Sequence, residues 1–359
     1  MTDLFDELDG TSTRRVLLLR DRDSGLRAIL AIDDLTLGPA MGGIRTRRYP
    51  SATEALRDAR NLAAAMTLKC AIAGLPAGGA KTVVLQTDDM DRPAAFRRLG
   101  EFIEDLGGLY RCAGDLGTTT EDLLNVATTT VHVNTGGDRL GLATGTGLVN
   151  CIRAVAALRG RDGLGGLRVA IQGCGLIGGG VARALAGEGV RLILADIDAG
   201  RAAALAGEVG GVAVPADDIL TVEADIMAPC AAGGVLTDAL VPRIRAWAIC
   251  GGANNQLARP EVGAALAARG IWYVPDFLAS AGAVIDGAAR LFDASGDPAP
   301  YLARLGATAR TVLEIAARDA RPTVEVATAL ARGRIAAARE GKVAPEALPA
   351  LNSMHYRTH

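Results

Sequence analysis

The sequence predicts an α/β protein of two domains, an N-terminal α/β domain and a C-terminal domain built on a doubly wound parallel sheet. At 359 residues, the chain is longer than one hydrophobic core usually organises. From residue 167 onward, apolar runs typical of strands alternate with helical segments at the spacing of βαβ units. A polar, glycine-rich stretch at 136–147 separates the two patterns and is the predicted hinge.

The N-terminal half begins with a predicted β-hairpin, in which 16–19 and 27–32 are joined across a turn. A glycine-rich loop is expected at 38–43. Ser51 and Glu54 form a capping-box pattern, which predicts the start of a helix. The remaining elements expected in this half are that helix at 55–66, a loop at 74–81, a strand at 82–85 and helices at 93–106 and from 120.

The C-terminal half follows a regular alternation of strands and helices. A helix at 148–158 leads into an apolar strand at 167–172. The later elements are strands at 190–195, 224–228, 246–250 and 271–274, and helices at 179–187, 199–208, 301–318 and 323–339.

Charge and hydropathy exclude several classes of partner. The net charge is −2, and the most basic stretch, 45–48, is short and is interpreted as a solvated loop. Nucleic acid is not an expected partner, because phosphate binding needs a clustered basic excess. No apolar stretch approaches the length of a transmembrane helix, and the acidic N-terminus lacks the order of a signal peptide. We therefore expect a cytoplasmic protein that does not enter a membrane.

Histidine and cysteine usage leaves acid–base chemistry to other residues. The six cysteines are scattered without a Cys-x-x-Cys pair, so no metal site is expected. Of the three histidines, His355 and His359 lie at the C-terminus, and His132 is interpreted as structural. A serine or cysteine hydrolase is therefore disfavoured, and lysine, aspartate or glutamate must supply any proton transfer.

One glycine motif has the context of a dinucleotide-binding loop. Residues 173–178 read Gly-Cys-Gly-Leu-Ile-Gly, follow an apolar strand directly and open a helix. The first glycine permits a tight turn, the second lets the backbone approach a pyrophosphate, and the third lets the helix pack against the strand. The helix N-terminus offers free N–H groups to the phosphates. The residues expected to bind the cofactor here are Gly173, Gly175, Leu176, Ile177 and Gly178.

The next strand ends in Asp196, at the position where a Rossmann domain binds the adenosine ribose. A carboxylate there accepts hydrogen bonds from the ribose hydroxyls and repels a 2′-phosphate. The sequence therefore predicts a Rossmann domain that binds NAD, while Arg201 leaves the use of NADP open.

Three residues of the N-terminal half have the chemistry of a catalytic centre. Lys69 follows a predicted helix, and Lys81 follows two glycines in apolar surroundings. The glycines at 78–79 are interpreted as letting a substrate approach beside Lys81, where desolvation would lower the pKa of the lysine into the range of a base. Asp115 lies in a loop of small residues. Taken singly, each residue is as consistent with a snorkelling lysine or a turn aspartate as with catalysis.

Taken together, six segments resemble the glutamate/leucine/phenylalanine/valine dehydrogenase family, and the resemblance extends from about residue 15 to 339. Their order and spacing are more specific than any one segment. The segments are Leu-Gly-Pro-Ala-Met-Gly-Gly-Ile-Arg at 37–45, Met-Thr-Leu-Lys at 66–69, Leu-Pro-Ala-Gly-Gly-Ala-Lys at 75–81, Gly-Asp-Leu-Gly-Thr at 114–118, Ala-Pro-Cys-Ala-Ala-Gly-Gly at 228–234 and Gly-Ala-Asn-Asn-Gln-Leu at 252–257.

The resemblance implies oxidative deamination of an L-amino acid to a 2-oxo acid and ammonia, without a metal. It implies that Lys81 is the base that activates water, that Asp115 exchanges protons with the substrate nitrogen, and that Lys69 pairs with the substrate carboxylate. By the same resemblance, Gly42, Met41 and Asn255 contact the substrate, and Thr144 and Asn254 contact the cofactor.

The resemblance also implies a domain arrangement and an assembly. A substrate-binding, catalytic and oligomerisation domain is expected at 1–140, rejoined by a C-terminal helix at 325–359, and the NAD-binding domain at 141–324. A homo-oligomer is expected through strands of the N-terminal domain. The expected substrate is a branched-chain amino acid of the leucine or valine type, and an aromatic amino acid such as phenylalanine or tryptophan is the alternative.

The chain departs from the family pattern at a few positions, namely Ala80, Gly141, Ser280 and Ala283. These departures bear on which amino acid is the substrate more than on the class of reaction. A hydroxy-acid dehydrogenase typically uses a catalytic pair of a histidine and an acid, and no such pair is expected in this chain. A non-catalytic NAD-binding sensor is the remaining alternative, and the presence of Lys69, Lys81 and Asp115 together argues against it.

Overall fold

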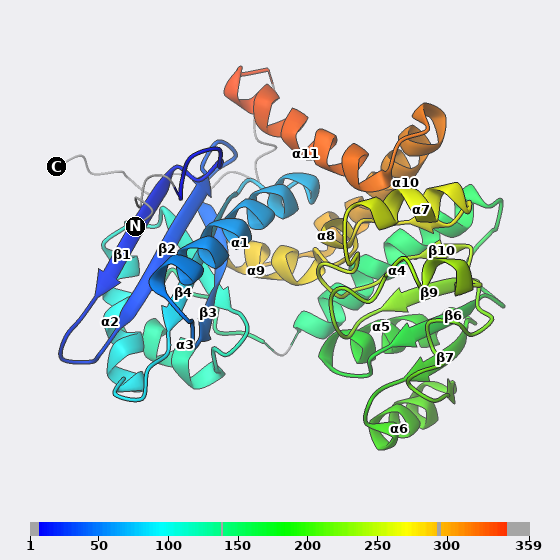
Figure 1. Cartoon of the computed structure of the whole chain (residues 1–359), viewed down its shortest axis with the longest axis horizontal. Coiled ribbons are helices and arrows are strands. Elements are labelled where there is room, and N and C mark those ends of the chain that lie inside the picture. Colours follow the sequence, from blue (N-terminus) through cyan, green and yellow to red (C-terminus); the bar gives the residue numbers. More distant parts are fainter. Residues whose placement is uncertain (1–6, 138, 293–295, 343–359) are drawn as a thin grey trace. The chain divides into compact units, whose positions relative to one another are not determined.

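The computed structural model describes residues 7–137, 139–292 and 296–342 and divides the chain into two compact units (Figure 1). Unit 1 holds the chain up to Gly137, then Gly287–Asp297 and the chain from Ala331. Unit 2 holds the chain from 138 to 286 and from 298 to 330. The assignment of substrate and cofactor binding to 1–140 and 141–324 stays a prediction, and the part of the predicted terminal helix beyond 342 lies outside the described residues.

Unit 1 contains a five-stranded sheet in the order β1-β2-β4-β3-β5. The predicted hairpin is confirmed, because β1 and β2 pair antiparallel. β4 pairs antiparallel with β2 and parallel with β3, and β3 is also parallel to β5. The strands are β1 (Arg15–Arg20), β2 (Arg27–Asp34), β3 (Ala40–Arg47), β4 (Gly78–Leu85) and β5 (Tyr110–Gly114).

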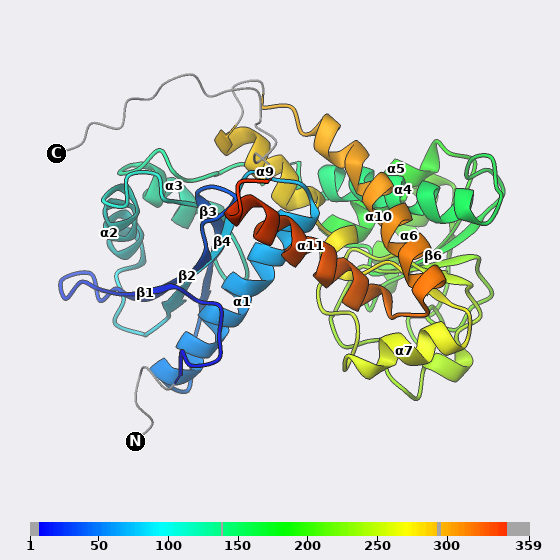
Figure 2. The ribbon, with the colours of Figure 1, turned by 90° about the horizontal axis from the view of Figure 1, so that it is seen from above.

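Helices cover both faces of this sheet (Figure 2). Helix α1 (Ala52–Ile72) packs its alanines and Leu56 against Ile29 and Val83 on one face. On the other face, α2 (Arg92–Glu104) and α3 (Thr120–Ala127) bury a core that includes Phe96. The alternation of side chains along β2 and β4 therefore serves two cores, one on each side.

Three boundaries in unit 1 differ from the sequence prediction. The glycine-rich stretch at 40–43 is part of β3, because it pairs with β5 as well as β4. Helix α1 continues to Ile72, so Lys69 lies in its last turn instead of after it. β4 begins at Gly78, so Lys81 lies within a strand. The space at Gly79 is not left for a substrate, since a Cβ there would lie 2.2 Å from the backbone nitrogen of Thr67 on α1.

Unit 2 contains a six-stranded, entirely parallel sheet in the order β11-β10-β9-β6-β7-β8. This order is that of a dinucleotide-binding doubly wound sheet, with the switch point between β6 and β9. The central strands lie side by side in Figure 1. The strands are β6 (Arg168–Gln172), β7 (Arg191–Ala195), β8 (Val212–Ala213), β9 (Ile226–Pro229), β10 (Ala248–Ile249) and β11 (Trp272–Tyr273).

One helix of unit 2 begins earlier than the sequence predicts. Helix α4 (Leu140–Leu158) starts eight residues before the predicted 148, so 140–147 is not a loop. Its glycines allow close packing, and a Cβ at Gly145 would lie 2.4 Å from the carbonyl oxygen of Gly180 on α5. The other helices here are α5 (Leu176–Ala186), α6 (Ala199–Val209), α7 (Glu261–Ala268), α8 (Asp276–Ala279) and α10 (Ala299–Asp319), while α9 (Gly282–Phe292) and α11 (Thr323–Arg339) run on into unit 1.

Helix α4 also corrects the expectation that no segment approaches the length of a membrane span. It is the one helix in the described ranges that is long and apolar enough to cross a bilayer. However, 67% of its apolar window is buried inside the protein. Its neighbours are α5 and α10, so its hydrophobicity is that of a core helix.

Candidate active site and cofactor loop

A buried lysine and an aspartate from two different strands meet in unit 1. Lys81 lies on β4 and is only 5% exposed. Its Nζ is 3.0 Å from Oδ2 of Asp115, which directly follows β5. Between these strands runs β3, and a Cβ on its Gly43 would lie 2.9 Å from Cβ of Asp115 and 3.1 Å from Nζ of Lys81. The absence of a side chain at Gly43 therefore lets the two charged groups meet across β3.

Arg45 completes this cluster, and the sequence reasoning missed it. Its Nε donates to the same oxygen of Asp115 at 2.7 Å. Its Nη1 lies 3.4 Å from Oδ2 of Asp58, which also accepts a hydrogen bond from the Tyr49 hydroxyl at 2.5 Å. The interpretation of 45–48 as a solvated loop is wrong at Arg45, whose side chain is 19% exposed. The available signal was that Gly43 and Arg45 share one face if the segment is a strand.

The surroundings of the cluster lower the pKa values of both Lys81 and Asp115. Burial lowers the pKa of Lys81, and the charge of Asp115 only partly opposes this effect. Burial alone would raise the pKa of Asp115, but Lys81 and Arg45 outweigh it and lower the pKa to about 2. The cluster thus combines a lysine that gives up its proton more readily than usual with a carboxylate that stays charged.

The other candidates of unit 1 lie on the elements around this cluster. Lys69 is partly buried in the last turn of α1. Met41 is buried on β3, where its Cε would lie 3.0 Å from a Cβ at Gly287. Gly42 lets β3 and β4 approach, since a Cβ there would lie 1.7 Å from the carbonyl oxygen of Ala80. Lys81 and Asp115, the two predicted catalytic residues, contact each other directly.

The predicted dinucleotide loop has the shape that a pyrophosphate needs. Gly173 has a φ of +90°, in the region that favours glycine. A Cβ at Gly178 would lie 1.8 Å from the Gly173 carbonyl oxygen, so this position fixes the helix against the strand. A Cβ at Gly175 would meet nothing within 4 Å, and no side chain caps the helix that begins at Leu176. The free N–H groups of α5 therefore face an open cradle suited to a phosphate group.

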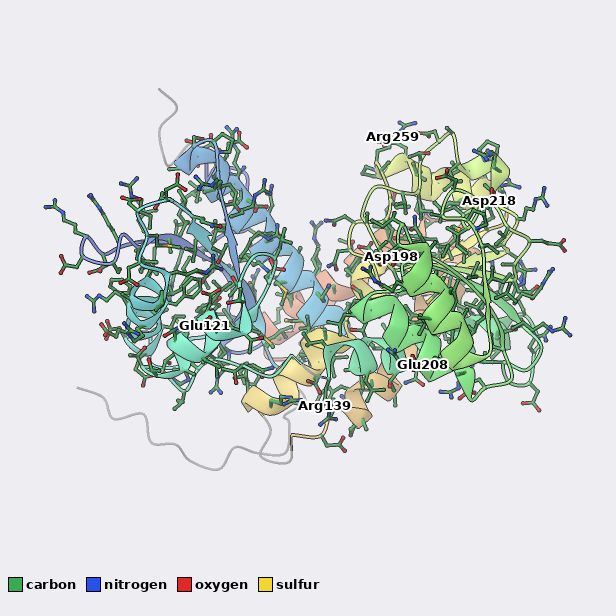
Figure 3. All side chains as sticks on the ribbon, turned by 90° about the horizontal axis from the view of Figure 1, so that it is seen from below. Glu121, Arg139, Asp198, Glu208, Asp218 and Arg259 are labelled. Atoms are coloured by element: carbon green, nitrogen blue, oxygen red, sulfur yellow. The ribbon has the colours of Figure 1, made fainter. Side chains whose placement is uncertain are left out.

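Asp196 lies at the end of β7, beside this loop. Its carboxylate accepts hydrogen bonds from the backbone N–H of Cys174 at 2.8 Å and of Asp198 at 2.9 Å. Burial would raise the pKa of Asp196, but these bonds and the nearby Arg201 lower it. Arg201 lies 3.2 Å from the carboxylate and also pairs with Asp198, the N-cap of α6 that is labelled in Figure 3. The neighbouring Ile197 is 97% exposed and offers an apolar face.

The remaining cofactor and substrate candidates gather at the carboxyl ends of β9 and β10. Thr144 is buried on α4, and its hydroxyl oxygen has no hydrogen-bond partner among the described residues. A Cβ at Gly252 would lie 2.5 Å from Ile177 and 3.7 Å from the Thr144 methyl group, so the three positions adjoin.

The loop after Gly252 presents two exposed asparagines. Asn255 has a φ of +52°, and its backbone N–H donates to Asp276 at 2.6 Å. Ser280, one of the departures from the family pattern, donates to the side chain of Asn254 at 3.2 Å. Ser280 therefore helps to hold Asn254, a candidate cofactor residue. The unpartnered Thr144 hydroxyl is a second polar group here, and the amide of a bound nicotinamide would give it a hydrogen-bond partner.

A doubly wound sheet with an open pyrophosphate cradle and a separate buried lysine–carboxylate pair define a dinucleotide-dependent dehydrogenase. Two family models match the chain, one described as the Glu/Leu/Phe/Val dehydrogenase dimerisation domain at residues 14–132 and the other as glutamate/leucine/phenylalanine/valine dehydrogenase at residues 195–289. The chain belongs to this family and is an NAD-dependent amino acid dehydrogenase.

Individual relatives cover almost the whole chain. It is 39% identical to leucine dehydrogenase of Geobacillus stearothermophilus over 95% of both chains. It is 36% identical to phenylalanine dehydrogenase of Lysinibacillus sphaericus, over 90% of this chain and 88% of the relative. Among solved structures, L-tryptophan dehydrogenase from Nostoc punctiforme superposes with a TM-score of 0.85 at 31% identity, covering 94% of this chain and 100% of that one.

Proposed function

We propose that the protein oxidatively deaminates a branched-chain L-amino acid of the leucine or valine type to its 2-oxo acid and ammonia. The observation that carries the proposed reaction is the buried contact between Lys81 and Asp115, with the pKa of the lysine lowered and that of the aspartate at about 2. The branched-chain substrate class is supported by the 39% identity to leucine dehydrogenase. Such a pair supplies a base and a fixed negative charge within reach of one reacting carbon.

Each residue of the pair has a distinct task in this reaction. NAD held by the loop 173–178 would supply the hydride acceptor, and oxidation at the substrate Cα gives an iminium group on the substrate. Asp115 stabilises this positive charge as a carboxylate, a role that its low pKa favours over the proton exchange that the family resemblance implies. Lys81 takes a proton from the water that attacks the iminium carbon, and the carbinolamine then collapses to the 2-oxo acid and ammonia. Lys69 binds the substrate carboxylate and so orients Cα.

Arg45 acts as a positioning residue in this proposal. It shares Oδ2 of Asp115 with Lys81 and is itself held near Asp58. The arginine keeps Asp115 ionised and disfavours a proton on Lys81 through charge repulsion. Both effects favour the protonation states that the reaction requires.

The cofactor is proposed to bind through the loop 173–178, with its pyrophosphate at the N-terminus of α5. Asp196 binds the adenosine ribose, and Thr144 and Asn254 contact the nicotinamide end. The second substrate class is an aromatic amino acid, favoured by the 36% identity to phenylalanine dehydrogenase and the similarity to the tryptophan dehydrogenase structure. Met41, Gly42 and Asn255 are proposed to contact the substrate, and Met41 offers an apolar surface.

A homo-oligomer is also proposed, with β1 at the interface. β1 is an edge strand of its sheet, and Leu18 on it is 63% exposed. An exposed edge with an apolar side chain is suited to pairing with a second copy. Size-exclusion chromatography with light scattering tests this, and the monomer mass at micromolar concentration would contradict it.

The central experiment measures NADH formation with a panel of L-amino acids. The proposal predicts the highest kcat/KM for leucine, isoleucine or valine, whereas a preference for phenylalanine or tryptophan would support the aromatic alternative. Replacing the base in Lys81→Ala should lower kcat by roughly 10²- to 10⁴-fold, the range for removal of a general base. NAD binding should be retained, and Lys342→Ala is the matched control. Full activity in Lys81→Ala would exclude this mechanism, and inactivity with every amino acid would favour the sensor.

A further inference from the structure

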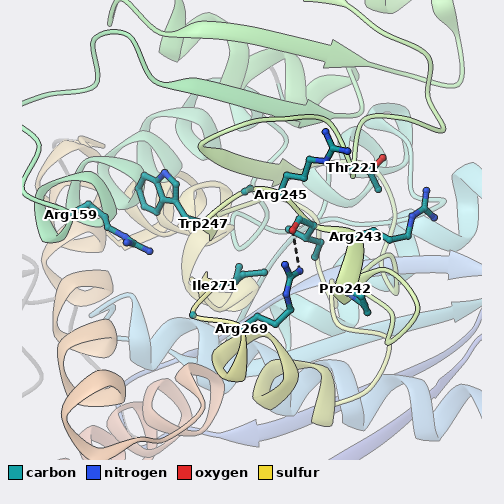
Figure 4. A pocket seen from close by; sticks show the side chains of 11 residues that line it. Arg159, Thr221, Pro242, Arg243, Arg245, Trp247, Arg269 and Ile271 are labelled. Atoms are coloured by element: carbon teal, nitrogen blue, oxygen red, sulfur yellow. Dashed lines mark hydrogen bonds between the residues drawn. The ribbon is translucent and has the colours of Figure 1, made fainter.

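A cavity of about 730 Å³ in unit 2 is lined by four arginines (Figure 4). We call it the arginine pocket; its lining residues are Arg159, Thr221, Pro242, Arg243, Ile244, Arg245, Ala246, Trp247, Arg269, Gly270 and Ile271. The lining includes no carboxylate. Its volume lies in the range of small-molecule sites.

The pocket lies at the edge of the sheet opposite to the dinucleotide loop. Segment 245–247 leads into the amino end of β10, and segment 269–271 leads into the amino end of β11. The dinucleotide loop and Asp196 instead follow the carboxyl ends of β6 and β7. Since the strands are all parallel, the two sites are on opposite edges of one sheet, so this pocket is separate from the proposed NAD site.

The positive charge of the pocket is not neutralised within the described part of the chain. None of its four arginines forms an ion pair there. The two acids that precede β9 are already engaged, because Arg168 pairs with Glu223 at 2.9 Å and with Asp225 at 3.3 Å. A group of arginines without counter-charges is costly to assemble unless an anion or solvent compensates the repulsion.

Two of the four arginines are held in place before any ligand binds. Arg159 stacks on Trp247 and Trp272, with its guanidinium carbon 5.0 Å and 4.8 Å from the two ring centroids. Arg269 donates to the carbonyl oxygen of Ile244 at 3.0 Å and to that of Val241. Figure 4 shows Arg269 directed toward the segment that carries Arg243 and Arg245. Such preorganisation reduces the entropy lost on binding.

We propose that the arginine pocket binds a small polyphosphate anion of nucleotide size. Guanidinium groups donate paired hydrogen bonds that match phosphate oxygens. Four of them around one cavity suit several phosphate groups better than a single carboxylate, and Trp247 and Ile271 provide apolar surface for an attached organic part. β10 and β11 lead from this pocket to Asn255 and Asp276, whose backbone-to-carboxylate contact supports the candidate nicotinamide loop.

Tryptophan fluorescence can report on ligand binding in the arginine pocket. Trp247 and Trp272 are its two tryptophans, and their rings pack edge to face at 6.3 Å beside Arg159. Titration of the full-length protein with inorganic triphosphate at constant ionic strength should give a saturable change in tryptophan fluorescence. Isothermal titration should give the same dissociation constant, and saturating NAD should leave it unchanged.

Matched variants separate this site from general attraction of anions. Arg243→Gln combined with Arg245→Gln should weaken triphosphate binding at least roughly tenfold, since charge-assisted hydrogen bonds are lost. Arg310→Gln, at an exposed arginine of α10, should bind as the wild type does, and all variants should bind NAD normally. Equal affinity in the double variant, displacement by NAD, or neither heat nor fluorescence change in the wild type would overturn the proposal.

Discussion

Arg45 and Lys81 contact the same oxygen of Asp115, at 2.7 Å and 3.0 Å. Two cations thus share one carboxylate, which leaves a net positive cluster in a largely buried place. Oδ2 of Asp58 lies 3.4 Å from Nη1 of Arg45 and compensates part of this charge. In the proposed mechanism, this arrangement biases Lys81 toward its neutral form while Asp115 stays ionised.

The first prediction concerns the pH dependence of kcat/KM. The base acts when neutral, so activity should fall as the pH drops through the pKa of Lys81, which burial places below its usual value. Arg45→Gln removes a nearby positive charge, so the pKa of Lys81 should rise and the acidic limb of the profile should move to higher pH. Arg45→Lys should restore part of the original position.

This shift is a readout that a purely structural role of Arg45 would not produce. Pre-steady-state measurement of hydride transfer at several pH values would show whether the shifted limb belongs to the chemical step and not to slow product release. Arg47→Gln, at the last residue of β3, is a control for loss of positive charge on the same strand. An unchanged limb in Arg45→Gln would refute the positioning role.

The second prediction concerns stability and Asp115. Its pKa is lowered from 3.8 to about 2 in the folded protein, so its ionised form stabilises the fold above pH 3.8, and this contribution is lost as the pH falls toward 2. The shift corresponds to about 2 kcal/mol at neutral pH. Asp115→Asn should therefore lower the unfolding free energy at pH 7, and the difference from wild type should shrink between pH 4 and pH 2. Urea unfolding at several pH values measures this, and a difference independent of pH would contradict it.

The third prediction separates two glycines of the dinucleotide loop. A Cβ at Gly175 meets nothing within 4 Å, so Gly175→Ala should fold normally but obstruct the pyrophosphate and weaken NAD binding by roughly tenfold or more. A Cβ at Gly178 would lie 1.8 Å from a carbonyl oxygen, so Gly178→Ala should destabilise the protein by about 3 kcal/mol. Gly187→Ala, at an open position that ends α5, is the control for both. Normal NAD affinity in Gly175→Ala would place the pyrophosphate elsewhere.

The sequence predicted the cofactor half more completely than the catalytic half, and the reason is physical. Residues 173–178 form a local feature, because the single unit of β6, loop and α5 places all of them. Asp196 follows the next strand. The contact between Lys81 and Asp115 joins separate strands across β3, so no spacing along the chain reveals it. Local sequence singles out Lys81 and Asp115 as separate candidates, and only the family resemblance assigns them roles in one reaction.

The largest differences between the predicted and the observed elements lie at glycine-rich segments. The glycines in β3 and at the start of α4 are typical of loops in the sequence, but tertiary packing requires small residues there. At Gly43 a side chain would collide with Asp115, and at Gly145 with the backbone of α5. Intrinsic propensity is overridden where two backbones or two charged groups must approach closely. The prediction of a solvated loop at 45–48 fails at Arg45 for a different reason, because β3 continues to Arg47 and directs this basic side chain into the cluster.

The last prediction concerns the choice between NAD and NADP. Asp196 carries the negative charge that should repel a 2′-phosphate, and Arg201 is held 3.2 Å from it. In Asp196→Ser the carboxylate is gone, and Arg201 becomes available to the phosphate. The ratio of kcat/KM for NAD to that for NADP should therefore fall by roughly tenfold or more, in the range expected for an added charge-assisted hydrogen bond. The double variant Asp196→Ser with Arg201→Ala should lose the gain with NADP while remaining weak with NAD. If the single variant loses activity equally with both cofactors, Asp196 serves the loop through its bond to the Cys174 N–H and does not select the cofactor.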